Sequence, residues 1–182
     1  MPIQFLSRTA TLFIVIAFAS IFQTAMAQEA LKPRLSPLAM TTFKYEDTYV
    51  KVTYCRPHIR DREVFGNIVP FGKVWRTGAN EATEITITED IQMDGHPVKA
   101  GTYTLFTIPG KEKWTIILNT ELGQWGAFDY NPDKNILTFD VPVQKTDVVY
   151  EPFTINFANK GEVVTLQLIW NTTMVEIPIT FD

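Results

Sequence analysis

The sequence predicts an all-β fold, an antiparallel β-sandwich with a β-barrel as the alternative. Three observations support this fold class. Apolar and polar residues alternate with a period of two in at least six short segments, turn-forming residues separate those segments, and no convincing amphipathic helix interrupts them. This pattern is typical of antiparallel sheets, in which one face of each strand packs on the core and the other faces solvent.

The N-terminus predicts export. Arg8 precedes an apolar run at residues 11–22, and the small-residue site Ala25-Met26-Ala27 follows. A basic start, a short apolar core and a small-residue end are the three parts of a secretory signal peptide. The apolar run is shorter than the roughly 20 residues that a membrane-spanning helix needs. We therefore expect a signal peptide over residues 1–27, cleavage after Ala27, a periplasmic or secreted protein, and no stable membrane insertion afterwards.

The remaining chain has the length of one ordinary domain. Residues 28–40 contain two prolines and no periodicity, which predicts an N-terminal spacer before a domain over residues 41–182. With 16 basic and 20 acidic residues, the chain has a formal net charge of −4. This mildly acidic balance gives no general attraction to nucleic acid, so we expect no nucleic-acid partner. The sequence leaves the oligomeric state open.

The strands follow from the alternating segments. Pro57 ends the first of them, because proline cannot donate to the ladder. The pair Asp94-Gly95 predicts a two-residue hairpin whose return strand continues to Ile108. The pair Asn171-Thr172 separates the last two segments. The expected strands cover residues 48–55, 82–90, 98–108, 114–119, 137–143, 153–157, 164–170 and 175–179.

The inward-facing positions of these segments define the expected core. Residues 120–135 lack the alternation but carry aromatic side chains, and we expect them to form a structured loop. The predicted core comprises Val52, Tyr54, Ile85, Ile87, Leu105, Ile116, Leu118, Phe139, Ile155, Leu166 and Leu168.

The segment from Tyr54 to Asn80 is the densest in reactive and charged side chains. It holds five basic residues, one of the two histidines, the only cysteine and one of the four tryptophans. Long segments of this kind between strands are where binding and catalytic residues concentrate. We therefore expect the functional site to include this segment.

Five segments form a recognisable set of motifs: YCRP at 54–57, VFGNIVPFGKVWRTGANEAT at 64–83, AGTYTLFTIPG at 100–110, WTIILN at 114–119 and WGAFDYNPDKNILTF at 125–139. Together they resemble the DUF2911 family, a group of mostly secreted bacterial domains of unknown function. The resemblance extends from about Pro37 to the C-terminus; it implies an all-β fold and no known reaction. Two features depart from the family. Asn135 and Thr138 stand in place of an Asp-x-x-Arg pair, and Cys55 stands where the YxRP-type motif often has serine.

Familiar catalytic signatures are absent from the sequence. No GxSxG, HExxH, P-loop or GxGxxG motif is present. His58 lies near Asp61 and Glu63, but nothing fixes a metal-binding spacing. Cys55 is expected to be a buried, unreactive thiol. The sequence therefore predicts no catalytic residue, metal site or cofactor.

Arginines provide the best candidate site. Planar guanidinium groups recognise carboxylates, phosphates and sulfates through paired hydrogen bonds, and aromatic rings stack on sugars or on guanidinium groups. We expect Glu81 to orient one arginine, and Trp125 or Tyr130 to close one wall of a shared concavity. The predicted ligand-binding residues are Arg56, Arg62, Trp75, Arg76, Asn80, Glu81, Trp125 and Tyr130.

A structural alternative stays open for the same residues. In that alternative, Trp75 belongs to the core and the arginines pair with loop carboxylates, namely Asp61, Glu63, Glu81 and Glu84.

Three classes of function remain. The favoured one is a non-enzymatic, exported binding module for a small anionic or saccharide ligand. The alternatives are an uncharacterised hydrolase-type enzyme that uses loop acids, and a structural or interaction domain of the cell envelope.

Overall fold

The computed structural model describes residues 32–160 and 163–181. The expected signal peptide over residues 1–27 lies outside the described residues. The chain divides after Pro33 into two units, and Arg34–Asp182 is the unit that contains all the described secondary structure. This unit confirms the predicted all-β class: within the described residues, the only helical segment is the 3-10 turn η2 (Pro132–Lys134). No helix in that part of the chain has the length and apolar character needed to cross a membrane.

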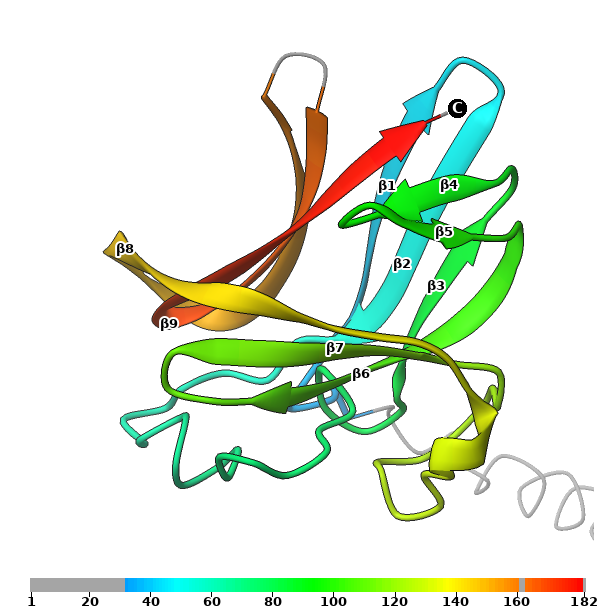
Figure 1. Cartoon of the computed structure of the whole chain (residues 1–182). Helices are drawn as coiled ribbons and strands as arrows, with labels where there is room; N and C mark the ends of the chain where they lie inside the picture. The colour runs from blue at the N-terminus through cyan, green and yellow to red at the C-terminus, as the bar shows by residue number, and fades with distance from the viewer. Residues whose placement is uncertain (1–31, 161–162, 182) are drawn as a thin grey trace, which may run out of the picture. The chain divides into compact units, whose positions relative to one another are not determined.

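Nine strands form one antiparallel sheet that does not close on itself (Figure 1). Its order is β1-β2-β3-β6-β7-β8-β9-β4-β5, so β1 and β5 are its two edges. The strands are β1 (Leu38–Tyr45), β2 (Thr48–Cys55), β3 (Thr83–Ile87), β4 (Ile91–Met93), β5 (His96–Val98), β6 (Gly101–Pro109), β7 (Lys113–Asn119), β8 (Asn135–Lys160) and β9 (Val163–Phe181).

Strand β1 differs from the prediction, which places residues 28–40 in a spacer and the first strand at Thr48. Leu38 and Met40 are 61% and 63% exposed, while the small side chain of Ala39 between them faces the core side. The large apolar side chains thus face solvent and the small one faces the core, so hydrophobic periodicity does not identify this strand. The strand is nevertheless paired residue by residue with β2.

The predicted hairpin at Asp94-Gly95 is confirmed. The prediction that its return strand continues unbroken to Ile108 is wrong. Strand β5 ends at Val98, and β6 starts separately at Gly101, opposite Ile87 of β3. The Asp90 carboxylate accepts a hydrogen bond from the backbone N–H of Ala100 at 2.9 Å and turns the chain between the two strands. Strand β4 of this hairpin pairs with β9, whereas β6 pairs with β3.

The expected turn at Asn171-Thr172 is also wrong, because β9 runs through it without a break. Asn171 has a φ of 56° and lies opposite Tyr150, where the pairing of β8 with β9 shifts register. An irregularity of this kind bends a strand without ending it. Strand β8 likewise replaces two expected strands: its first part pairs with β7 and its second part pairs with β9.

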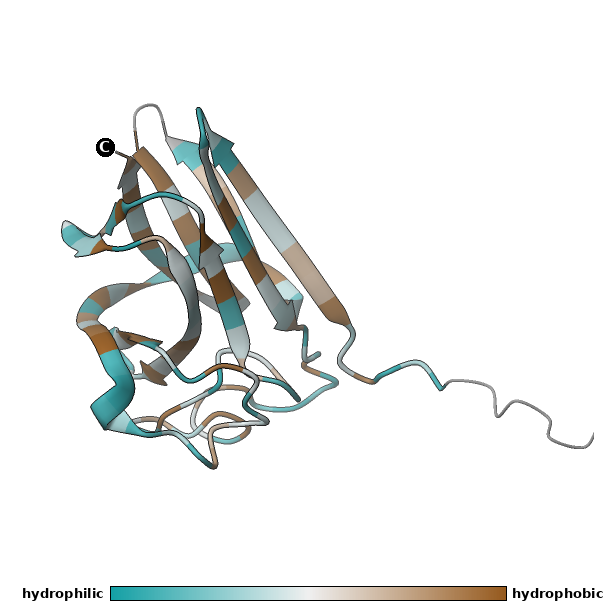
Figure 2. Ribbon diagram, turned by 90° about the vertical axis from the view of Figure 1, so that its right-hand side faces the viewer, coloured by the Kyte–Doolittle hydropathy of each residue, from teal (hydrophilic) through white to brown (hydrophobic). Residues whose placement is uncertain are grey.

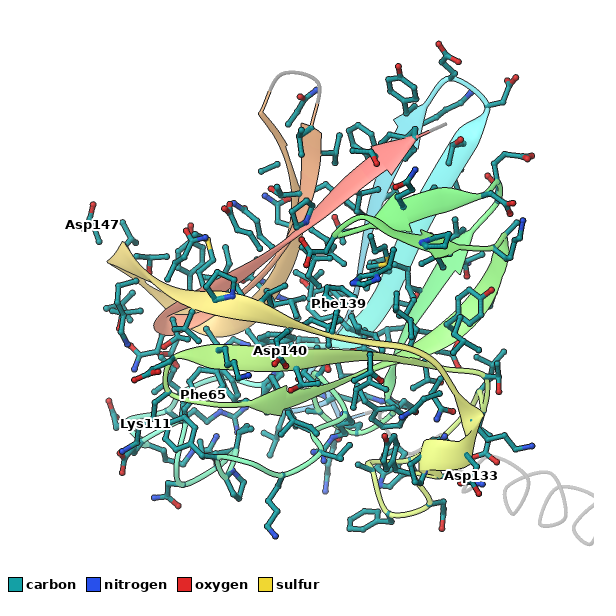
Figure 3. The ribbon with its side chains drawn as sticks, in the orientation of Figure 1. Phe65, Lys111, Asp133, Phe139, Asp140 and Asp147 are labelled. Atoms are coloured by element: carbon teal, nitrogen blue, oxygen red, sulfur yellow. The ribbon has the colours of Figure 1, made fainter. Side chains whose placement is uncertain are left out.

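All of the predicted core residues are buried. Hydrophobic and hydrophilic residues alternate along the strands (Figure 2), as a one-sided core requires. Phe139 and Asp140 on β8 illustrate this alternation (Figure 3), since Phe139 is buried and Asp140 is exposed. The Asp140 carboxylate accepts hydrogen bonds from Lys113 and Thr115 on β7, each at 2.6 Å. The hydrogen bond with Lys113 is the main reason that the pKa of Asp140 is lowered.

Aromatic contacts join parts of the sheet that are far apart in its strand order. The ring of Phe43 on β1 lies 5.7 Å from that of Phe157 on β8, and Tyr45 stacks on Phe181 of β9 at 4.8 Å. A second cluster of rings fills the core beside the long loop that follows β2. Its members are Phe65, Trp75, Trp114, Phe153 and Trp170.

Candidate functional site

The loop between β2 and β3 is fixed by hydrogen bonds along its second half. Trp75 exchanges two backbone hydrogen bonds with Thr107 of β6, at 2.7 and 3.0 Å. The Trp75 indole donates to the carbonyl of Gly78 at 3.0 Å. Successive residues in an extended chain point to opposite sides, so Trp75 enters the core while Arg76 faces away from it. The segment that carries Arg76 is thus held rigidly against the sheet.

Arg76 belongs to a hollow of about 530 Å³ beside this loop, which we call the arginine hollow. Three further arginines line the hollow with it: Arg34 from the segment before β1, and Arg60 and Arg62 from the long loop. Trp125, which is 58% exposed, comes from the loop after β7. The remaining lining residues are Leu35, Ser36, Pro57, Ile68, Ala79 and Asn80.

The charges in this hollow are poorly balanced. Arg34 forms an ion pair with Glu81 at 2.7 Å. Arg62 donates to the carbonyls of Ile59 and His58, at 3.0 and 2.8 Å. The guanidinium of Arg60 donates to the carbonyl of Leu35. Within residues 32–160 and 163–181, neither Arg60 nor Arg62 forms an ion pair with a carboxylate.

Arg76 is the least satisfied of the four arginines. Its Nε atom is buried and has no hydrogen-bond partner in the described part of the chain. Removal from water lowers the pKa of Arg76, as expected for a cation that lacks a neighbouring carboxylate. Because arginine stays charged even when its pKa falls moderately, this side chain retains a positive charge and an unused donor. It is therefore a strong candidate for contact with an anion.

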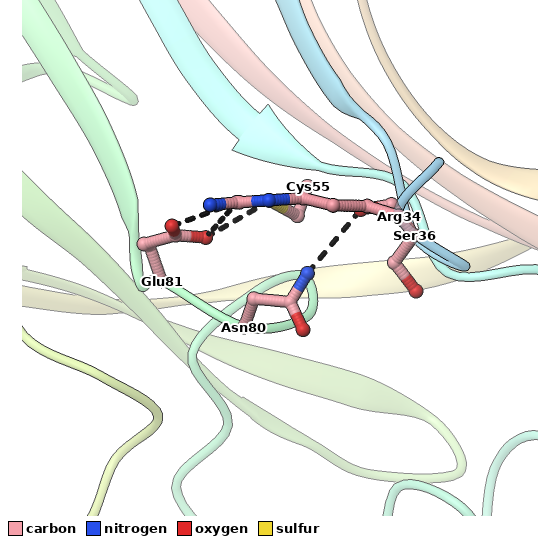
Figure 4. Close-up of polar contacts among 5 residues, drawn as sticks. All are labelled: Arg34, Ser36, Cys55, Asn80 and Glu81. Carbon is pink, nitrogen blue, oxygen red and sulfur yellow. Dashed lines mark hydrogen bonds and ion pairs between the residues drawn. The ribbon is translucent and has the colours of Figure 1, made fainter. Parts of the chain in front are cut away.

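A second hollow, of about 460 Å³, lies next to the first, and Arg34 lines both. The Arg34 Nη1 atom binds both oxygens of Glu81, at 2.7 and 2.9 Å, and the Cys55 thiol donates to Glu81 at 3.2 Å (Figure 4). A hydrogen bond from its own backbone amide, followed by the bond from Arg34, lowers the pKa of Glu81. Burial raises the pKa of Cys55, which agrees with the expectation of an unreactive thiol.

The structure brings together half of the predicted site residues. Arg62, Arg76, Asn80 and Trp125 line the arginine hollow. Glu81 lies next to them and pairs with an arginine, but that arginine is Arg34, which the prediction does not include.

The other three predicted residues lie elsewhere. The Arg56 guanidinium donates to the Phe153 carbonyl and the Thr154 hydroxyl of β8, at 3.1 and 2.9 Å. Trp75 is only 7% exposed and lies in the aromatic cluster of the core. Tyr130 packs its ring edge-on against Phe106 and accepts a hydrogen bond from Asn135. These three side chains support the fold around the site rather than its surface.

Sequence reasoning missed Arg34 and Arg60. Arg60 lies in the segment from Tyr54 to Asn80, and the high density of basic residues in that segment could have identified it as a site residue. Arg34 lies in the expected spacer and reaches the site because the chain before β1 is attached to the long loop. Asn80 donates to the Ser36 carbonyl at 3.2 Å (Figure 4), and the backbone N–H of Arg56 donates to Pro37 at 2.9 Å.

The described residues contain no group of three or more histidine, cysteine or acidic side chains that could hold a metal ion. In a comparison with known families, the family model described as "Protein of unknown function (DUF2911)" matches residues 36–179. No curated protein matches the chain significantly, and neither does any solved structure.

Proposed function

The chain belongs to the DUF2911 family, whose function is unknown, and from its arginine hollow we propose that it is an exported binding module for a small anionic ligand. Acidic saccharides are the class that suits the hollow best. The proposal involves no chemical reaction. It rests chiefly on Arg60, Arg62 and Arg76, which line one hollow without a carboxylate partner in the described residues.

The energetic reason lies in the cost of unpaired charge. The guanidinium group of Arg76 is partly removed from water, so it loses hydration and regains that energy only from an anion or another acceptor, whereas Arg60 and Arg62 are exposed. Hydrogen bonds to charged groups contribute about 1.5–3 kcal/mol each. The net charge of the chain is −4, so the local excess of positive charge runs against the overall balance. An anion in the hollow would give Arg76 the charged partner that it lacks among the described residues.

Trp125 favours a ligand that carries a ring. Its side chain is 58% exposed at the wall of the hollow, which is unusual for so large an aromatic group. An exposed indole beside charged groups offers a flat apolar surface to the carbon face of a sugar. A saccharide with a carboxylate, sulfate or phosphate group would therefore use both the arginines and the tryptophan.

The alternative of a hydrolase-type enzyme has weaker support. Glu81 and Glu84 line the same neighbouring hollow, and paired carboxylates are the usual acid and base of glycoside hydrolysis. A general acid needs a raised pKa to hold its proton at neutral pH. The pKa of Glu81 is lowered instead, so Glu81 is unsuited to that role.

The prediction of anion binding can be tested by thermal unfolding with glucuronate and sulfate at constant ionic strength. A ligand at about 100 times its Kd stabilises the folded state by about 2.7 kcal/mol, which corresponds to a rise in Tm of about 5–10 °C. Arg76→Gln is expected to abolish most of this rise, because the substitution removes the charge and the unsatisfied donor.

Arg56→Gln is the matched control, because Arg56 bonds to β8 and does not line the hollow. It is expected to keep the full response to anions even if the Tm of the free protein falls. Sulfate also stabilises proteins by exclusion from their surface, so the decisive quantity is the difference between wild type and variant. An equal response in wild type and Arg76→Gln would contradict the proposal.

The compartment and the finer architecture are part of the same proposal. We propose that the sheet folds over into the two layers of a β-sandwich, which the contact between Phe43 and Phe157 supports. We also propose that residues 1–27 are a signal peptide and that the mature protein is periplasmic or secreted. Mass spectrometry of the exported protein is expected to give an N-terminus at Gln28. A mature protein that still carries Met1 would rule out cleavage.

A further inference from the structure

The hollow next to the arginine hollow has the opposite chemical character, and we call it the acceptor hollow. Its polar lining includes Glu81, Glu84 and Gln124, with Arg34 as the only basic residue among them. The Gln124 Oε1 atom is buried and has no hydrogen-bond partner among the described residues. Glu84 accepts one bond from the backbone N–H of Gly123 at 2.9 Å. This lining suits a group that donates hydrogen bonds or carries a positive charge.

Residues of one short β-bridge line both hollows. Glu81 pairs with Trp125 in this bridge, and its hydrogen bonds run from Ala82 N–H to the Gln124 carbonyl and from Gly126 N–H to the Asn80 carbonyl, at 2.8 and 2.9 Å. Directly opposed residues of an antiparallel pair face the same side, so the side chains of Glu81 and Trp125 are neighbours.

Neighbouring residues of the bridge line different hollows. Asn80 and Trp125 line the arginine hollow, whereas Glu81 and Gln124 line the acceptor hollow. The bridge thus adjoins one hollow lined by donors and the exposed ring and another lined by acceptors. Because Asn80 is adjacent to Glu81 and Gln124 is adjacent to Trp125, the two hollows meet along the bridge.

The ion pair of Arg34 and Glu81 forms the partition between the hollows. Arg34 lines both, and the side chains of the pair are 53% and 42% exposed. Exposed ion pairs contribute little to stability and exchange readily with other partners. A ligand that presents an anion to Arg34 and a cation to Glu81 would replace this contact with two equivalent ones.

We propose that the ligand is bipolar: an amino-saccharide with an acidic group at the arginine hollow and an ammonium group at the acceptor hollow. This inference rests on the proposed anion-binding function and deepens it. Arg62 and Arg76 bind the acidic group, Trp125 contacts the sugar ring, and Glu84 with Gln124 receives the ammonium group. A ligand with only negative charge accounts for the first hollow, but it leaves the charge of Glu84 without a cation and the Gln124 Oε1 atom without a donor among the described residues.

Three matched probes test the inference in calorimetric titrations: glucosamine 6-phosphate, glucose 6-phosphate and glucosamine. The first carries both charges, the second only the anion and the third only the ammonium group. Wild type is expected to bind glucosamine 6-phosphate about tenfold more tightly than glucose 6-phosphate, a difference of about 1.4 kcal/mol. Glucosamine alone is expected to bind most weakly.

Two variants separate the inference from the proposed function. Glu84→Gln keeps an acceptor for Gly123 but removes the charge, so it is expected to erase the preference for glucosamine 6-phosphate and to leave glucose 6-phosphate binding unchanged. Arg76→Gln is expected to weaken both phosphates. Equal affinity of wild type for the two phosphates, or a preference that survives Glu84→Gln, overturns the bipolar ligand while anion binding stands. If neither phosphate binds, or if Arg76→Gln changes neither affinity, both proposals fail.

Discussion

Trp170→Ala is expected to lower the free energy of unfolding by about 3–5 kcal/mol, the usual range for removing a fully buried tryptophan. Trp170 is 0% exposed and stacks on Trp75 with ring centroids 6.0 Å apart. Its indole N–H donates to the Glu151 carbonyl at 3.1 Å, so the substitution leaves a cavity and removes one of the two hydrogen bonds that this carbonyl accepts. A loss of this size is a large share of the stability of an ordinary domain.

Urea unfolding measures this effect, and the exposed Trp125 provides the control. The midpoint for Trp170→Ala is expected to fall with an unchanged m-value, as for a loss of stability without a change in the surface exposed on unfolding. Trp125→Ala removes the same side chain from a position that is 58% exposed, and surface changes usually stay within about 0.5 kcal/mol. Similar losses in the two variants would mean that the aromatic cluster does not stabilise this fold.

The core was predictable because burial is encoded locally in a β protein. Each strand alternates between two faces, so period-two patterns identify inward positions without knowledge of the strand's partners. Val52, Ile85 and Leu166 come from three different strands and are all completely buried. Local alternation thus predicted the composition of the core before the sheet order was known.

Strand partners were not predictable in the same way. Ile91 and Met93 of β4 pair with Phe181 and Ile179 of β9, across most of the length of the domain. No local pattern encodes such a pairing, because it depends on which strands become neighbours when the whole sheet forms. The same limit explains Asn171, whose turn-like chemistry is used for an irregularity within β9 rather than for a hairpin.

The candidate site was predictable only in part, for a related reason. Arg62 and Arg76 were found because charge is dense along one segment. Arg34 was not found, because it meets Glu81 across 47 residues of sequence. Trp75 and Arg76 are neighbours in an extended segment, so they face opposite sides and cannot both line one wall. That rule was available from the sequence and would have assigned Trp75 to the core.

Gly78→Ala is expected to lower the free energy of unfolding by about 1–3 kcal/mol, the usual cost of overpacking, and to weaken anion binding as well. A Cβ atom at this position would lie 2.9 Å from the carbonyl oxygen of Cys55 and 3.2 Å from the Thr83 hydroxyl. That carbonyl belongs to the backbone at the end of β2 and also accepts the N–H of Ala79, so it cannot move aside independently. The loop itself must therefore shift.

The consequence for binding follows from the position of Gly78 between the two polar groups that the loop contributes to the arginine hollow. Arg76 and Asn80 each lie two residues away, and both line the hollow. Gly72→Ala is the control: its positive φ of 69° costs about 1 kcal/mol for a residue with a Cβ, but nothing lies within 4 Å of the added atom. Titration with glucuronate is expected to show weaker binding for Gly78→Ala and wild-type binding for Gly72→Ala. Wild-type affinity in a destabilised Gly78→Ala protein would mean that the anion does not depend on the placement of Arg76, and the arginine hollow would lose its central residue.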